Sequence, residues 1–355
     1  MKKIFIIMMV LCSAVIAKAQ NESMTAILQH GETASVFKGM NALKEAYEAA
    51  VDGDVITLSS GEFYPVAIQK SISIYGAGFE SNSDDGTEVT NIIKGNGYLS
   101  VGAETETVKN VHLEGLHICG VYLCAYDGYG NQGQPVENIT ISKCYFDTGA
   151  SVEVKNNVKD VSITNCVFSG EGSIVGNKDY VAENLYVGNC HIGGNVRLFS
   201  DQSSVMINHC IVMVGYYHGS YGSTDPMKYS PFVWTNCIFG MKCSEYSYAV
   251  GVGSTVRNCI VPCLDYCLYN VYGIHENNIE VARDQVFVNF SDGTYAADRT
   301  FEINSPDTWI GADGTEIGIR GGEGWNKVPK TPVVKNLQLN VEGKTLKVNY
   351  DAVVR

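Results

Sequence analysis

Three charged residues, Glu153, Lys155 and Arg197, stand in short segments that otherwise contain mostly apolar and uncharged polar residues. A lysine or arginine can act as the base that removes the proton beside the carboxylate of a uronic acid, while a positive charge or calcium neutralises that carboxylate. Glu153 or Asp201 could help to hold such a cation. These residues are therefore candidates for catalysis of eliminative cleavage, with Lys155 or Arg197 as the base.

Aromatic residues accompany these charges in segments expected to lie on the same surface. Aromatic rings on an exposed strand face can stack against sugar rings, and interspersed Glu, Lys and Arg side chains can recognise carboxylates. The alternative is that tyrosine simply suits an exposed β-sheet. The candidate substrate-binding residues are Tyr122, Tyr126, Tyr217, His218, Tyr246, Tyr248 and Tyr269.

An internal repeat predicts the elements that carry these residues. Alignment of seven segments superposes Leu116, Cys144, Cys166, Cys190, Cys210, Cys237 and Cys259. Consecutive residues of this column lie 20 to 28 positions apart, which is the period of a solenoid. Apolar residues recur around each of them, as in Val161, Ile163, Cys166 and Phe168. This alternation predicts two short strands, and the interval of three residues between them requires a bend.

Asparagine stands at the predicted bend in four units. It tolerates left-handed backbone angles, and its amide can hydrogen-bond to the same residue one coil away. These residues are Asn165, Asn189, Asn236 and Asn258. The rest of the unit holds a third predicted strand, as in SVEV (151–154), SIV (173–175), VRLF (196–199), YSYAV (246–250) and LYNV (268–271). Three parallel strands per coil, without room for a crossover helix, predict an all-β fold, a parallel β-helix with a repeat of about 22 residues.

These features resemble the right-handed parallel β-helix proteins of the pectate-lyase-like superfamily, which share the pectin lyase fold. The resemblance covers residues 38–325. The segment ALKEAYEAAVDGDVITLSSGEFYP, which starts at Ala42, is similar to the capping helix and first coil of that superfamily. The segment SPDTWIGADGTEIGIRGG (305–322) resembles the closing coil of secreted bacterial β-helix proteins.

The residue patterns at the two ends of the predicted β-helix support a capping helix at its N-terminal end and a hairpin at its C-terminal end. An apolar helical stripe begins after Asn41 and ends at Gly53, and such a helix would cover the open first coil. The stripe consists of Ala42, Leu43, Ala46, Tyr47, Ala50 and Val51. We expect a β-helix domain with this cap over residues 20–325, followed by a β-hairpin tail over residues 326–355.

The resemblance implies that substrate lies along the sheet formed by the third strands. Insertions at 128–137 and 222–230 would wall a groove four coils long, or about 19 Å, which suits several sugar rings. Hydrolases of the polygalacturonase type carry motifs of which this chain has only Asp84-Asp85 and His218-Gly219. The Arg-x-Pro-x-x-Arg motif of pectate lyases is also absent from the chain. If the protein is an enzyme, a lyase of another branch is therefore favoured over a hydrolase.

Residues 1–19 have the pattern of a secretory signal peptide. Lys2 and Lys3 precede an apolar run, and Ala17-Lys18-Ala19 forms a cleavage site. We therefore expect a secreted, periplasmic or cell-surface protein without a transmembrane segment. The net charge of −13 would become −16 after cleavage, which argues against nucleic acid as a partner. We expect a monomer whose partner is a polysaccharide or a cell-surface glycan.

We expect the cysteines, the histidines and a cluster of acidic residues to have mainly structural roles. The six column cysteines are expected to be buried thiols and not disulfides. Five further cysteines could pair, although the sequence does not reveal how: Cys119, Cys124, Cys243, Cys263 and Cys267. Four histidines are expected to point outward into solvent: His112, His117, His191 and His209. No protein metal site is assigned, although Asp84, Asp85 and Glu88 could bind calcium or simply form a solvated turn.

Two functional hypotheses remain open. The first is a polysaccharide lyase or glycosidase of unknown specificity, suggested by the family resemblance. The second is a non-catalytic β-helix that binds glycan or serves as a surface module, suggested by the lack of a complete catalytic motif.

Overall fold

The computed structural model describes residues 24–81, 88–95, 97–147, 149, 151–213, 216–217, 231–241, 247–248, 250, 253–268, 273–329, 332–342 and 345–354. The predicted signal peptide and the predicted wall at 222–230 lie outside these residues, as do Asp84 and Asp85.

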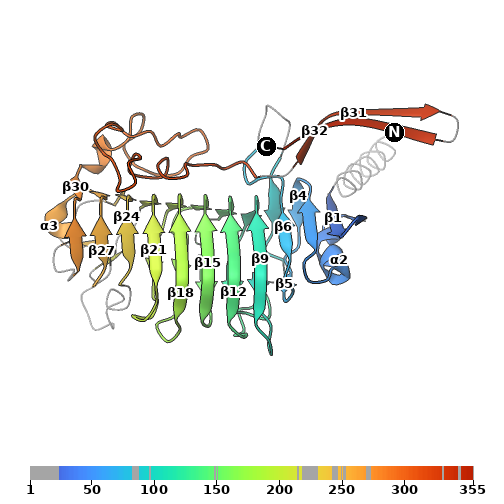
Figure 1. Ribbon diagram of the computed structural model, residues 1–355, viewed down its shortest axis with the longest axis horizontal. Coiled ribbons are helices and arrows are strands. Elements are labelled where there is room, and N and C mark those ends of the chain that lie inside the picture. Colours follow the sequence, from blue (N-terminus) through green and yellow to red (C-terminus); the bar gives the residue numbers. More distant parts are fainter. Residues whose placement is uncertain are drawn as a thin grey trace, which may run out of the picture.

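The chain winds into a right-handed parallel β-helix, which confirms the predicted fold class (Figure 1). Each complete coil contributes one strand to each of three sheets, as in β12 (Val136–Ser142), β13 (Tyr145–Phe146) and β14 (Ser151–Val154). Strands of successive coils pair in parallel, so that β12 lies between β9 (Val108–Glu114) and β15 (Val158–Thr164).

The other strands of the three sheets have the following bounds. Sheet 1 also contains β1 (Thr25–His30), β2 (Thr33–Lys38), β3 (Val55–Leu58), β6 (Ser73–Tyr75), β18 (Ala182–Gly188), β21 (Val205–Asn208), β24 (Val233–Thr235), β27 (Thr255–Arg257) and β29 (Ile274–Glu276). Sheet 2 also contains β4 (Gly61–Phe63), β7 (Thr90–Ile92), β10 (His117–Ile118), β16 (Val167–Phe168), β19 (His191–Ile192), β22 (Ile211–Val212), β25 (Ile238–Phe239), β28 (Ile260–Val261) and β30 (Ile279–Glu280). Sheet 3 also contains β5 (Ala67–Ile68), β8 (Leu99–Val101), β11 (Val121–Leu123), β17 (Ser173–Val175) and β20 (Val196–Arg197).

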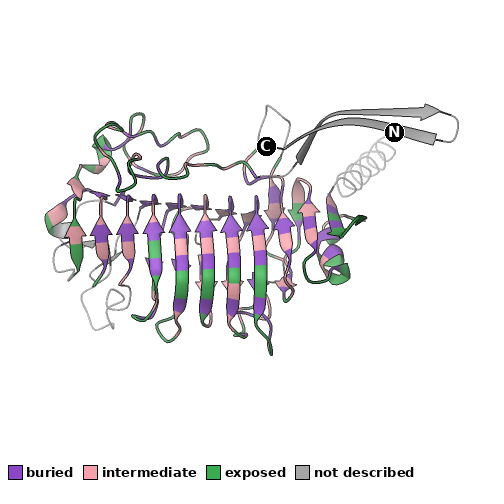
Figure 2. Cartoon of the chain, in the orientation of Figure 1, coloured by how far each residue is buried: buried purple, intermediate pink, exposed green. Residues whose placement is uncertain are grey.

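The predicted column of cysteines lies inside the coils. All six column cysteines and Leu116 are completely buried, and the six thiols are free, as predicted. Each thiol occupies a place in a continuous stack, in which the backbone N–H of Cys166 points to Cys190 Sγ at 3.4 Å. Aromatic residues stack in the same way, since the rings of Phe146 and Phe168 lie 4.5 Å apart and nearly parallel. Buried and exposed bands therefore cross the strands of sheet 1 at matching heights (Figure 2).

The predicted bends adopt the left-handed backbone conformation. Positive φ angles of 48° to 56° occur at Asn165, Asn189, Asn236 and Asn258. Their amides do not form the simple ladder that we expected. Asn189 donates to the carbonyl oxygens of Ile319 and Gly321, because a later segment of the chain covers the bends.

The N-terminal cap is a helix and a hairpin together. Helix α2 (Ala42–Ala49) forms where the apolar stripe predicts it, although Val51 beyond its end is half exposed. Strands β1 and β2 form an antiparallel hairpin that extends sheet 1 beyond β3, which the sequence did not indicate. The hairpin and helix together cover the first coil, where unpaired backbone groups would otherwise be exposed.

Residues 283–329, here called the return segment, run back along the solenoid after the last coil (Figure 1). The segment begins with a 3₁₀ turn, η2 (Arg283–Gln285). Apolar side chains of the return segment, such as Phe301 and Ile317, form a second core with Ile211, Ile238 and Ile260 on the outer face of sheet 2. The prediction that 305–322 forms a closing coil is therefore wrong. This stretch packs against coils formed about one hundred residues earlier in the chain.

The return segment also changes the environment of two histidines. His191 is only 2% exposed and His209 is fully buried, so the prediction that they are solvated is wrong. Both do point away from the interior of the coil, but the return segment covers them. His112 and His117 are partly buried and pair with Glu114 and Asp147.

The last predicted third strands differ from expectation. Strand β26 (Ser247–Tyr248) pairs antiparallel with β23 (Tyr216–Tyr217) and is not part of sheet 3. Leu268 follows a helical turn, α3 (Leu264–Cys267), and the other residues of the predicted strand 268–271 lie outside the described residues. The predicted C-terminal hairpin is present as β31 (Pro332–Glu342) and β32 (Thr345–Val354).

Candidate functional site

Sheet 3 brings three of the predicted site residues onto one face. Its register pairs Tyr122 of β11 with Glu153 of β14, and then pairs Val175 of β17 with both Glu153 and Arg197 of β20. The residues that flank them along each strand, such as Val152, are buried in the coil, so these side chains point outward. At about 4.8 Å per strand, the row from Tyr122 to Arg197 is about 14 Å long.

Lys155 lies at the centre of a compact group of side chains. Its ammonium donates to Glu153 Oε2 at 2.5 Å and lies 4.7 Å from the centroid of the Tyr122 ring. Burial raises the pKa of Tyr122, and the Glu153 carboxylate adds to this effect. Because Lys155 serves here as a donor, the geometry suits recognition of a carboxylate or hydroxyl better than abstraction of a proton.

Two further residues that we did not single out extend the same face. The rings of Tyr98 and Tyr122 meet edge to face with centroids 5.2 Å apart. The ammonium of Lys94 lies 4.6 Å from the centre of the Tyr98 ring, and its hydrogen bond with Tyr98 raises the pKa of Lys94. The signal for Tyr98 was present in the sequence, because it directly precedes LSV (99–101), which has the alternation of a third strand.

A hollow of about 450 Å³ opens beside Tyr98. Lys44 of helix α2 and Tyr64, which is 37% exposed, line it together with Tyr98. Backbone at Gly97 and Gly128 forms part of its surface, and a Cβ on Gly97 would lie only 2.9 Å from the carbonyl oxygen of Gly128. The hollow continues the aromatic and cationic row toward the N-terminal cap.

The predicted wall at 128–137 packs directly on the row. A Cβ on Gly130 would lie 3.1 Å from the Tyr122 ring and 3.4 Å from Lys155 Cε. Tyr126, at the start of this loop, is partly buried, and its carbonyl oxygen accepts a hydrogen bond from Gln69. Tyr129 at the tip of the loop is 74% exposed. The loop therefore packs against Tyr122, whereas it leaves Arg197 uncovered.

The remaining predicted site residues cannot be added to this face. Tyr217 and Tyr248 lie in the separate pair β23 and β26. His218, Tyr246 and Tyr269 lie outside the described residues. The groove between two walls that we expected therefore stays a prediction.

Among the described residues, His, Cys, Asp and Glu side chains nowhere form a group of three or more that could hold a metal ion. Most of the predicted calcium turn lies outside the described residues, which include only its flanks, such as Glu88. Of the five cysteines outside the column, Cys119 and Cys124 are free, whereas Cys263 is disulfide-bonded.

The helices in the described part of the chain are too short or too polar to cross a membrane. Comparison of the chain with known protein families, curated proteins and solved structures found no match.

Proposed function

We propose that the protein is a secreted β-helix that binds acidic polysaccharide along sheet 3. The observation that carries the proposal is a group of aromatic and cationic residues on one face. The Tyr98–Tyr122 ring pair lies with Lys94 and Lys155, and Arg197 lies on the same sheet two strands beyond Glu153. Three cations gather on this face although the chain has a net charge of −13, and a negatively charged ligand would be attracted to them.

The parts of the row have complementary roles in this proposal. The tyrosine rings offer an apolar surface to the faces of sugar rings, while the cations pair with uronate carboxylates. Arg197 can bind a carboxylate through two parallel hydrogen bonds, and Lys155 contributes a point charge whose position Glu153 sets. The N-terminal signal pattern and the superfamily resemblance both support a role in contact with extracellular polysaccharide.

Titration calorimetry with hexagalacturonate as the acidic probe tests this proposal. Replacement Arg197→Met should weaken binding by about tenfold or more, because it removes a charge-assisted hydrogen bond. Tyr122→Ala should weaken it by about two- to tenfold through loss of an aromatic surface. Binding should also weaken as salt is added.

Lys155→Met has a matched control in Lys159→Met. Lys159 is paired with Glu183 at 3.5 Å on sheet 1, so the same substitution there removes an equivalent ion pair from a different face. Only the change at Lys155 should weaken binding. Equal effects of the two variants, or no binding of hexagalacturonate by the unmodified protein, would refute the proposal.

The same samples test the lyase alternative. Eliminative cleavage creates an unsaturated product that absorbs ultraviolet light, so its appearance can be followed directly. Product formation that disappears in Lys155→Met or Arg197→Met would establish the enzyme reading and assign these residues a role in catalysis. Binding without product formation would support the non-catalytic reading.

A further inference from the structure

A second cleft, of about 660 Å³, lies between sheet 1 and the return segment. Its volume is within the range of known ligand sites, about 300–1,000 Å³. Sheet 1 contributes Thr164, Tyr186 and Asn208, the bend after β18 contributes Asn189, and the return segment contributes Asp313 and Glu323. This cleft lies on a different sheet from the proposed acidic-saccharide site, so the two can be tested independently.

Tyr186 lines this cleft with a ring that lies against its own strand. A Cβ on Gly188 would lie 2.5 Å from the Tyr186 hydroxyl and 2.6 Å from Cε1, so the ring occupies the space that any other residue at 188 would need. Burial raises the pKa of Tyr186, partly offset by a hydrogen bond with the Asn208 side chain that holds the ring in place. The absence of a side chain at Gly188 thus lets an aromatic ring lie against the strand.

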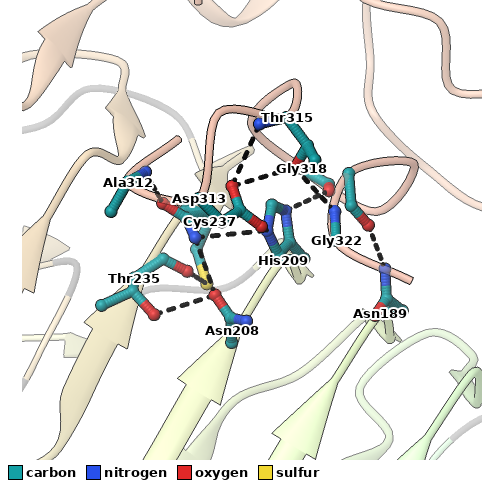
Figure 3. A network of polar contacts seen from close by, with 12 residues as sticks. Asn189, Asn208, His209, Thr235, Cys237, Ala312, Asp313, Thr315, Gly318 and Gly322 are labelled. Carbon is teal, nitrogen blue, oxygen red and sulfur yellow. Dashed lines mark hydrogen bonds and ion pairs between the residues drawn. The ribbon is translucent and has the colours of Figure 1, made fainter. Parts of the chain in front are cut away.

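The return segment supplies an anchored carboxylate to the same cleft, that of Asp313 (Figure 3). His209, which is buried, is hydrogen-bonded through Nε2 to Asp313 Oδ2 at 2.8 Å. Thr315 donates to Asp313 Oδ1 through its backbone N–H and its hydroxyl. Burial raises the pKa of Asp313, but these hydrogen bonds outweigh it and hold the pKa below its ordinary value. Asp313 is therefore ionised at neutral pH.

The backbone around this carboxylate is held to the bends that follow the strands of sheet 1. Asn189 donates to two carbonyl oxygens of the return segment, and Asn236 Oδ1 accepts from the backbone N–H of Ala312. The return segment buries its apolar residues in the separate second core. The second core packs without the polar residues that line the cleft, so these residues are available to bind a ligand.

The charges of the two sites are opposite. The lining of this cleft includes two carboxylates, Asp313 and Glu323, together with amides and hydroxyl groups, and it includes neither lysine nor arginine. We propose that the cleft binds a saccharide without carboxylates, stacked on Tyr186, and that it prefers an amino sugar. Amides and hydroxyls recognise sugar hydroxyls, while the two carboxylates attract an ammonium group and repel a uronate.

The test uses three oligosaccharides as probes in titration calorimetry: a glucosamine hexamer with protonated amines, cellohexaose and hexagalacturonate. Tyr186→Ala should weaken binding of the glucosamine hexamer and cellohexaose by about tenfold, the size expected for loss of one stacked ring. It should leave hexagalacturonate binding unchanged. Glu323→Gln, a change at an exposed position, should weaken binding of the glucosamine hexamer by about threefold and should not affect cellohexaose.

Tyr180→Ala is the matched control, because Tyr180 belongs to the same coil but its hydroxyl contacts Gln132 outside the cleft. Tyr186→Phe keeps the ring and should keep most of the affinity. The proposal is overturned if neither the amino nor the neutral hexamer binds saturably, or if Tyr186→Ala acts no more strongly than Tyr180→Ala. It is also overturned if hexagalacturonate binding depends on Tyr186. An unchanged glucosamine affinity in Glu323→Gln overturns the amino-sugar preference.

Discussion

Acidification should weaken the attachment of the return segment to sheet 2, because a buried histidine lies between them. His191 is surrounded by the rings of Tyr295 and Phe301 at 5.7 and 5.3 Å, and its Nε2 donates to the carbonyl oxygen of Gly293. Its Nδ1 is buried and has no hydrogen-bond partner, which suits a neutral imidazole. Burial lowers the pKa of His191 to about 4, although the hydrogen bond to Gly293 opposes this shift.

The size and sign of the effect follow from this pKa. In the unfolded chain histidine titrates near pH 6.5, so between about pH 6.5 and 4 the unfolded chain binds a proton that the native protein does not. The free energy of unfolding is therefore highest above pH 6.5 and falls through this window. A difference of about 2.5 pKa units corresponds to about 3 kcal/mol in total, of which about 2.5 kcal/mol is lost by pH 4.5.

Other groups that could contribute act in a different range or can be separated. Asp292 and Asp313, whose pKa values are lowered, add their losses below about pH 4, the ordinary range for aspartate. Partial burial also lowers the pKa of His275, which belongs to β29, so this residue contributes in the same window as His191. Substitution of each histidine by glutamine distinguishes the two contributions.

The assay is urea unfolding between pH 7 and pH 4.5, followed by tryptophan fluorescence. Trp325 reports on the return segment, since its ring lies 6.4 Å from that of Phe301. His191→Gln should remove most of the loss in unfolding free energy over this range, whereas His275→Gln should leave it largely in place. Equal pH dependence in the unmodified protein and in His191→Gln would refute the reasoning.

Two further predictions concern the bends and the column of thiols. Asn189→Ala should lower the hydrogen-exchange protection of the return segment by about 1–3 kcal/mol through the loss of two hydrogen bonds. It should cost about 1 kcal/mol more than Asn189→Gly, which tolerates the φ of 48°, and equal costs would contradict the assigned backbone strain. The column thiols, exemplified by Cys166 and Cys210, should resist alkylation in the native protein and react after unfolding. Site-resolved mass spectrometry measures this, and native labelling of either would argue against the buried column.

The period of the sequence was sufficient to predict the coils. Apolar alternation around Cys144, Cys166 and Cys190 predicts which side chains face inward, and the asparagines predict left-handed bends. Neighbouring coils repeat the same local pattern, so the partner of each strand is the equivalent strand one period away. The alignment of Glu153 with Arg197 could be predicted for this reason.

Other contacts of the sheet 3 site involve residues outside the repeating strands. Lys155 lies beside Glu153 in the same coil, and the ring of Tyr98 meets that of Tyr122 in the neighbouring coil. The packing of Gly130 against Tyr122 depends on the shape of an insertion, which strand periodicity does not describe. Local patterns therefore predict which face a residue occupies, but they do not predict the loop that covers it.

The repeat specifies the solenoid, its buried thiols and the outward row on sheet 3. The path of the return segment depends on long-range packing, which joins Asp313 to His209 and Ile319 to Asn189 across more than one hundred residues of chain. Stacked coils are specified by short-range repetition. A segment without a repeat is positioned by whichever distant surface buries its apolar residues and satisfies its polar groups, and that surface exists only after the coils have formed.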